Sequence, residues 1–217
     1  MHVNIQKVCQ TAFALALVLA VAGCSTPGRS STTKATSGVE AVQKRMTTGE
    51  QQMNATVQSL VDLTSNPQPD LRPQYNKYLD NLSKLEAQIK KGRGEREAMR
   101  TQAQAYFAKW EQDIQTLQNE DIKKVAIARR DAMMASFQKI TDEFTKAKPT
   151  FQLFMNNLKE VQKALDFDLT PGGVTAIKPI VGKIQDEATD VKKNIANIRA
   201  ELDRVASEMA ATAPGSQ

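Results

Sequence analysis

The sequence predicts an all-α protein, an elongated antiparallel helical bundle or coiled coil of three to five helices. Apolar residues recur at alternating steps of three and four along most of residues 39–211, which is the spacing of one face of an α-helix. No sustained alternation of apolar and polar residues and no Asn-Gly or Asp-Gly dipeptide indicates strands or hairpins. Because short breaks separate the periodic segments, consecutive helices should be antiparallel and share one apolar seam.

Residues 1–23 have the features of a lipoprotein signal peptide. Lys7 gives the start of this segment a positive charge. The apolar run that follows it is too short for a permanent membrane span. The run ends in Leu19-Ala20-Val21-Ala22-Gly23-Cys24, which is a lipobox. We therefore expect cleavage before Cys24 and attachment of lipid, palmitate included, to this residue.

An ordinary signal-peptidase site is the alternative, because Ala20, Ala22 and Gly23 are all small. If Cys24 is acylated, the residue after it is Ser25 rather than Asp. The usual sorting preference of Gram-negative bacteria then favours the outer membrane. We expect a lipoprotein of the cell envelope, anchored in the outer membrane by its lipid and facing the periplasm.

Residues 24–38 are expected to form a flexible tether. After Cys24 this segment is rich in Ser, Thr, Gly, Pro and basic residues, and so few apolar groups cannot offset the entropy cost of ordering the chain. A tether of this length could extend over about 45 Å. The folded bundle should occupy residues 39–211, followed by a disordered tail at residues 212–217.

The composition excludes several classes of function. The chain carries a net charge of +5, and removal of Lys7 with the signal leaves +4, which is too mild to argue for nucleic acid as a partner. His2 and Cys9 are the only histidine and the only cysteine besides Cys24. The mature chain thus lacks the groups for a Ser-His-Asp or Cys-His triad, a histidine-ligated zinc site or a structural disulfide. We expect no enzyme, no cofactor and no metal.

The first helix should run from about residue 39 to residue 63. Its seam contains a glycine and a threonine at two apolar positions, and comprises Val39, Val42, Met46, Gly49, Met53, Thr56, Leu60 and Leu63. Pro67 and Pro69 end this helix, and Asp70 is expected to cap the next one.

The second helix should extend from about residue 71 to residue 89. Its seam is apolar without a gap: Leu71, Tyr75, Tyr78, Leu82, Leu85 and Ile89. Gly92 and Gly94 follow within a basic run and predict a turn.

The third helix should open near Glu95. The apolar pattern loses phase between Asn119 and Arg130, which leaves open whether the helix breaks there. The pattern returns at Phe137 and keeps its spacing across Pro149, which predicts a kinked helix or two nearly collinear ones.

A loop is predicted at residues 166–173, with Thr170 as the cap and Pro171 as the first residue of the last helix. That helix has the most regular seam of the chain, from Val174 to Met209. Pro179 should bend its first turns.

The predicted turn is the main candidate contact site, because Lys90, Lys91, Arg93 and Arg96 would lie together at the tip of a hairpin. Such a tip could touch an anionic lipid or polymer; a plain solvated turn is the alternative. The pair Lys44 and Arg45 is expected on a solvated helix face.

Aromatic residues near the seam could form a platform for a glycan or peptide, but their spacing favours core packing: Tyr75, Tyr78, Tyr106, Phe107 and Trp110. Phe107 lies one step off the stripe. Asp166 and Asp168 provide too few oxygen ligands for calcium. Gly172 and Gly173 lack the other residues of a phosphate loop.

Two motifs carry a resemblance to a family of bacterial envelope proteins known only as domain of unknown function 2959. They are Phe107-Ala108-Lys109-Trp110-Glu111-Gln112-Asp113 within a helix, and Ala147-Lys148-Pro149 followed by Phe154 and Leu158. The loop through Leu169 and the long last helix fit as well, so the chain resembles the family from about residue 70 to residue 205. The segment 43–48 departs from the signature of the family's first helix. The resemblance implies an all-helical coiled-coil fold and no known activity.

These observations favour a non-enzymatic structural or protein-interaction element of the envelope. We expect an unidentified envelope protein as its partner. The coiled coil could also form homo-oligomers. The alternative is a helical binding module, a carrier or holdase for a lipid or hydrophobic polypeptide. Large seam residues predict a closed core, whereas small ones would leave a groove. Gly49, Thr56 and Ala103 are the places where the seam is weakest.

Overall fold

The computed structural model describes the backbone of residues 27–212 and the side chains of residues 32–210. These residues form five helices and no strand: α1 Pro27–Ser65, α2 Arg72–Gln115, α3 Glu120–Phe167, α4 Pro171–Ala176 and α5 Lys178–Thr212. Cys24 and the signal segment lie outside the described residues, as do residues 213–217 of the predicted tail.

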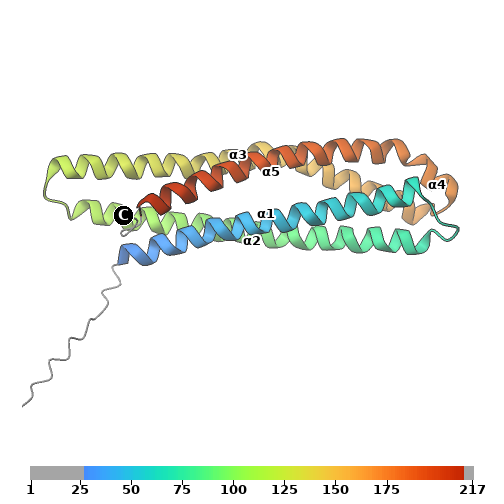
Figure 1. The fold of residues 1–217 in the computed structure, drawn as a ribbon, viewed down its shortest axis with the longest axis horizontal. Helices are drawn as coiled ribbons and strands as arrows, with labels where there is room; N and C mark the ends of the chain where they lie inside the picture. Colours follow the sequence, from blue (N-terminus) through green and yellow to red (C-terminus); the bar gives the residue numbers. More distant parts are fainter. Residues whose placement is uncertain (1–26, 213–217) are drawn as a thin grey trace, which may run out of the picture.

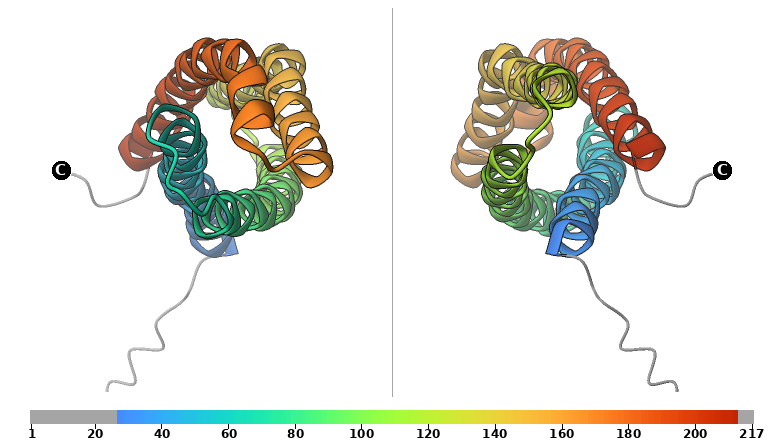
Figure 2. Two further views of the ribbon diagram at one scale, coloured as in Figure 1. Left: turned by 90° about the vertical axis from the view of Figure 1, so that its right-hand side faces the viewer. Right: turned by 90° about the vertical axis from the view of Figure 1, so that its left-hand side faces the viewer.

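The four long helices run antiparallel in chain order and form a ring when viewed end-on (Figures 1 and 2). α1 packs against α2 and α5, and α3 packs against the same two helices, with the slightest contact between α2 and α3. The longest helix, α3, has 48 residues, or about 72 Å at 1.5 Å per residue. The predicted elongated all-α bundle is confirmed.

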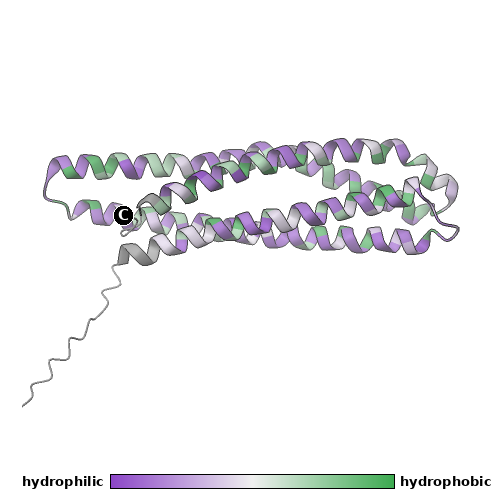
Figure 3. Cartoon of the chain, viewed as in Figure 1, coloured by the Kyte–Doolittle hydropathy of each residue, from purple (hydrophilic) through white to green (hydrophobic). Residues whose placement is uncertain are grey.

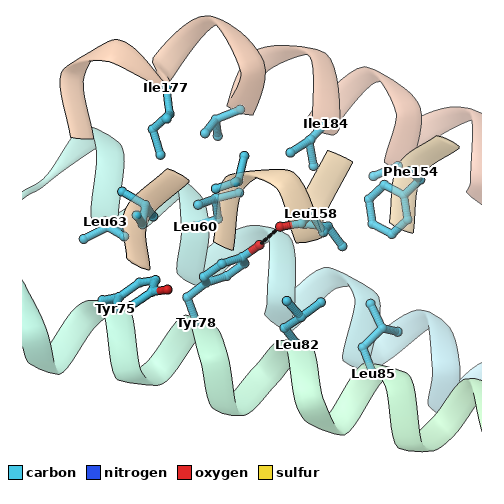
Figure 4. Close-up of a cluster of buried hydrophobic side chains, with 14 of the residues drawn as sticks. Leu60, Leu63, Tyr75, Tyr78, Leu82, Leu85, Phe154, Leu158, Ile177 and Ile184 are labelled. Carbon is cyan, nitrogen blue, oxygen red and sulfur yellow. Dashed lines mark hydrogen bonds between the residues drawn. The ribbon is translucent and has the colours of Figure 1, made fainter. Parts of the chain in front are cut away.

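Each long helix is amphipathic, with polar and apolar residues alternating along the ribbon (Figure 3). The buried side chains form two clusters rather than one continuous core. The cluster toward α4, called here core A, includes Leu60, Tyr78, Phe154, Leu158 and Ile184 (Figure 4). The other, core B, includes Val39, Tyr106, Phe137, Ile140 and Leu202.

The predicted turn at residues 90–96 is wrong, because α2 continues without a break from Arg72 to Gln115. The spacing of three and four runs through the basic segment, with Gly92 and Arg96 at the two seam positions between Ile89 and Met99. Neither Gly92 nor Gly94 has a positive φ. Packing along the seam thus outweighs the cost of two helical glycines, about 1 kcal/mol each relative to alanine.

The flexible tether predicted for residues 24–38 is also wrong over its described part, because α1 begins at Pro27. The seam continues backward from Val42 through Val39 to Ala35, and the last two side chains are almost fully buried in core B. Gly38 is buried too, with Gln102 of α2 packed against it. Tertiary packing therefore overrides the weak helix propensity of the Ser, Thr and Gly residues.

The break near residues 119–130, which the sequence left open, lies at residues 116–119, between α2 and α3. The side chain of Asn119 caps α3 by accepting hydrogen bonds from the backbone N–H groups of Asp121 and Ile122 at 3.0 and 3.1 Å. This hairpin projects past the ends of α1 and α5 (Figure 1). The seam loses phase here because the first buried side chain of α3 is Met133, thirteen residues after the helix begins.

Three later prolines are predicted to lie within a helix, at a helix start and at a bend, and the structure differs from the prediction at the last of them. α3 continues through Pro149. Thr170 caps α4 by accepting a hydrogen bond from the N–H of Gly173 at 3.1 Å, and Pro171 is the first helical residue. The last helix does not merely bend near Pro179: it is interrupted at Ile177, between α4 and α5.

Candidate functional site

A cavity of about 620 Å³ lies between core A and core B and is lined by α1, α2, α3 and α5. Its volume falls within the range of about 300–1,000 Å³ that small-molecule sites occupy.

Small residues at seam positions of three helices create this cavity. Gly49 of α1, Gly92 of α2 and Ala147 of α3 all line it. The neighbouring steps of each seam carry larger side chains, all of them apolar except Arg96 of α2. A Cβ on Gly49 would have no heavy atom within 4 Å. Thr56 leaves no gap, because it is buried and its hydroxyl donates to the carbonyl oxygen of Asn81 at 3.1 Å.

The wall of the cavity is mainly apolar. Large side chains from all four helices contribute, among them Met46, Met53, Ile89, Phe151, Val191 and Ile195. A cavity with such a wall favours the hydrocarbon part of a ligand over water.

Two of the charged residues in the wall are neutralised by neighbouring helices. Arg45 of α1 donates through Nε and Nη2 to both carboxylate oxygens of Glu95 on α2, at 2.9 and 2.7 Å. Its Nη1 donates to Gln88 at 2.6 Å, and the bond with Glu95 raises the pKa of Arg45. Glu50 pairs with Arg199 of α5 at 3.0 Å. These contacts fasten α1 to both of its neighbours beside the cavity.

Three further cations in the wall have no carboxylate partner within 4.0 Å among the described residues: Arg93 and Arg96 of α2 and Lys148 of α3. The guanidinium of Arg96 lies over the ring of Phe144, 5.3 Å from its centre. Glu97, next to Arg96 in the chain, is instead bound to Arg100 at 2.5 Å. The wall therefore has an uncompensated positive charge.

The three unpaired cations mark the opening of the cavity. The only exposed members of its wall are Arg93, Arg96, Lys148 and Gln152, all of them on α2 and α3. These two helices also make the slightest contact in the ring. The cavity thus opens between α2 and α3, with cations on both sides of its mouth.

The model of the family described as protein of unknown function (DUF2959) matches residues 28–210. The chain belongs to this family. The match includes α1, so the departure at residues 43–48 does not exclude the first helix. Comparisons with curated proteins and with solved structures found no match.

In this DUF2959 chain the four basic residues proposed as a hairpin tip do not form one group. Arg93 and Arg96 line the cavity, whereas Lys90 and Lys91 are exposed on α2 and are not part of its wall. Lys148, which sequence reasoning did not select, joins Arg93 and Arg96. Arg45 is not simply solvated, since it links α1 to α2. The signal for this arrangement is the unbroken spacing from Leu85 to Tyr106, which puts Gly92 and Arg96 at seam positions of one continuous helix.

The aromatic residues are in the cores, as their spacing favoured. Tyr75, Tyr78 and Tyr106 are buried, and Phe107 and Trp110 are half-buried. The hydroxyl of Tyr75 donates to Asp166 at 2.5 Å. Burial and this bond raise the pKa of Tyr75, and burial raises that of Tyr78.

Asp166 and Asp168 are used separately, since Asp168 accepts a hydrogen bond from Thr170 at 2.7 Å while Asp166 binds Tyr75. No group of three or more His, Cys, Asp or Glu side chains suited to a metal ion occurs in the described part of the chain. Among the helices of residues 27–212, none is long and apolar enough to cross a bilayer.

Proposed function

We propose that the protein is a lipid-anchored, non-enzymatic binding module of the bacterial cell envelope, which takes a hydrophobic ligand into the cavity between its helices. The observation that supports this proposal is the apolar cavity of about 620 Å³. A rod that served only as a structural element would gain stability from a continuous core. Small residues at three adjoining seam positions instead leave room for a guest.

The membrane anchor in this proposal is Cys24, which lies three residues before the start of α1. Three residues span at most about 11 Å, so a lipid on Cys24 would hold this end of the bundle close to the membrane surface. The same end carries the projecting α2–α3 hairpin (Figure 1). Ile122 and Val125 near its tip are 57% and 62% exposed, and exposed apolar groups suit contact with a bilayer interface.

The ligand-binding part of the proposal is tested with a neutral hydrophobic fluorophore, N-phenyl-1-naphthylamine, added to the mature chain bearing Cys24→Ala. We expect saturable binding. Gly49→Leu should abolish it by filling the cavity while leaving the fold intact, because the added side chain has open space around its Cβ. Gly94→Leu is the matched control, since Gly94 is helical, also has open space and does not line the cavity. Absence of binding, or equal loss in both variants, would refute the proposal.

The anchor is tested separately by membrane fractionation of the full-length chain. We expect the wild-type protein in the outer-membrane fraction with a mass that includes acyl chains, and Cys24→Ala in a soluble fraction. A wild-type mature protein without acyl chains would support the ordinary signal-peptidase site instead.

A structural or protein-interaction element remains the second candidate. The observation that favours it is exposed apolar surface at both ends of the bundle: Ile122 and Val125 at the α2–α3 hairpin, and Phe167, 95% exposed, at the end of α3. Crosslinking in cells from these positions should then capture a partner protein. A bundle that binds no small hydrophobic probe but forms such crosslinks would favour this candidate.

A further inference from the structure

The cavity has an apolar interior, and cations without carboxylate partners lie at its mouth. This combination indicates the charge of the ligand as well as its hydrophobic character. Arg93, Arg96 and Lys148 lie at the opening between α2 and α3, and the acid and base deeper in the wall, Glu50 and Arg45, are already paired. A neutral hydrocarbon would leave three like charges facing one another across the mouth. An anionic group would compensate them.

We propose that the ligand is a single-chain anionic amphiphile, with its hydrocarbon chain between core A and core B and its carboxylate or phosphate head at Arg93, Arg96 and Lys148. The inference rests on the proposed function, because it names the ligand class for the same cavity. Arginine is well suited to this role, since its planar guanidinium offers paired N–H donors to carboxylate and phosphate oxygens. Lys148 adds a point charge from the opposite helix.

The size of the cavity selects the amphiphile over a polypeptide. One turn of an α-helix, about 10–12 Å wide and 5.4 Å long, already occupies about 420–610 Å³. The cavity of about 620 Å³ would thus hold little more than one turn of a hydrophobic helix. A flexible acyl chain needs no backbone hydrogen-bond partners, whereas an extended peptide would bring unpaired N–H and C=O groups into an apolar wall.

The neighbouring charges fix where the head group lies. The Arg45–Glu95 pair closes the α1–α2 side of the ring, and the Glu50–Arg199 pair closes the α1–α5 side. On the α2–α3 side, the contact at this level is the guanidinium of Arg96 over the ring of Phe144. Arg96 can keep this contact while it binds an oxyanion, because its guanidinium carries five N–H donors and the contact with the ring does not occupy all of them.

The experiment compares ligands that share a twelve-carbon chain and differ in the head: dodecanoate, dodecyl phosphate, dodecanol and dodecyltrimethylammonium. Each displaces N-phenyl-1-naphthylamine from the mature chain bearing Cys24→Ala, below the concentration at which the ligand forms micelles. We expect the anionic ligands to bind about tenfold or more tightly than dodecanol, since charge-assisted hydrogen bonds are the strong class, and the cationic ligand most weakly. The ratio of dodecanoate to dodecyl phosphate tells a carboxylate head from a phosphate head.

Variants separate the head-group contacts from the cavity itself. The triple change Arg93→Gln, Arg96→Gln and Lys148→Gln should remove the preference for anionic ligands and leave binding of N-phenyl-1-naphthylamine within about twofold. The matched control is Lys90→Gln, Lys91→Gln and Lys139→Gln, which removes the same charge from exposed residues outside the wall. It should retain most of the preference. The preference should also fall as salt rises, because exposed charges are screened over about 8 Å at physiological ionic strength.

The outcomes distinguish failure of this inference from failure of the proposed function. If N-phenyl-1-naphthylamine binds and Gly49→Leu abolishes the binding, but the head charge makes no difference, the inference is overturned and the binding module stands. If the control triple variant loses the preference as fully as the test variant, the preference for anionic ligands comes from the net charge of the protein and not from the three cations at the mouth. That result also overturns the inference. Absence of binding by every probe overturns both.

Discussion

The hydroxyl of Tyr78 on α2 donates a hydrogen bond of 2.6 Å to the carbonyl oxygen of Leu158 on α3, and both side chains are fully buried in core A (Figure 4). This bond joins two helices whose mutual contact is the slightest in the ring. It also satisfies a polar group that would otherwise be costly at this depth.

Tyr78→Phe should lower the free energy of unfolding by about 1 kcal/mol, because phenylalanine keeps the packing of the ring and loses only the hydrogen bond. Equilibrium urea denaturation, followed by the far-ultraviolet circular dichroism of the helices, measures the change. An unchanged midpoint and slope would show that the bond contributes nothing to stability.

The same two tyrosines should make the bundle sensitive to alkali. Burial, with the bond to Asp166 in the case of Tyr75, raises the pKa of both phenols above the ordinary value of 10.0. The unfolded chain therefore releases these protons at lower pH than the folded chain. Their contribution to stability is complete below about pH 10 and is lost as the pH rises toward the pKa of the folded state.

We expect the urea midpoint to fall more steeply above about pH 10 in the wild-type chain than in Tyr75→Phe/Tyr78→Phe, which cannot release these protons. Lysines titrate in the same range in both proteins, so the difference between the two curves isolates the tyrosines. Parallel curves would contradict the prediction.

Gly94→Ala should stabilise the protein by about 0.5–1 kcal/mol, since alanine is the better residue in a helix interior. A Cβ at this position meets nothing within 4 Å, and the backbone has no positive φ. Thermal unfolding measures the shift. If residues 90–96 formed a turn with Gly94 in the left-handed conformation, the same change would destabilise, so the sign of the effect tests the continuity of α2.

Gly38→Leu should destabilise the protein by about 1–3 kcal/mol, the usual cost of overpacking. A Cβ here would overlap the side-chain carbonyl of Gln102 and lie 3.3 Å from the backbone Cα of Met99. Gly182→Leu is the control, because Gly182 is also helical and a Cβ there meets nothing within 4 Å. No difference between the variants would mean that the first turns of α1 are not packed against α2.

Phe154→Ala should cost about 3–5 kcal/mol through the loss of a large buried side chain and the cavity left behind. Phe154 is 0% exposed and belongs to core A, whereas its neighbour Leu153 is 47% exposed. Leu153→Ala should therefore change the free energy of unfolding by less than about 0.5 kcal/mol. Chemical denaturation of both variants tests the register of α3 beyond Pro149, and equal losses would show that the register is wrong.

The sequence by itself determined the fold class, because the spacing of three and four in segments such as Val181 to Met209 depends only on the geometry of the helix. It also predicted the cap at Thr170, since capping involves residues within one turn. It could not place the start of α1 or the end of α2 correctly. The glycines at 38, 92 and 94 have the local preferences of linkers and turns, and packing against Gln102 and Arg45 on other helices decides that these segments are helical.

The cavity likewise depends on the tertiary structure. The sequence predicts Gly49 as a weak position of one seam, but a gap in one helix can be filled by a large side chain from the helix opposite. Only the folded ring shows that Gly92 and Ala147 lie beside the same space and that Arg93, Arg96 and Lys148 surround its opening. These residues come from segments up to about a hundred positions apart, so no local pattern brings them together. Their proximity follows from the antiparallel register of four long helices, which is set by the packing of core A and core B.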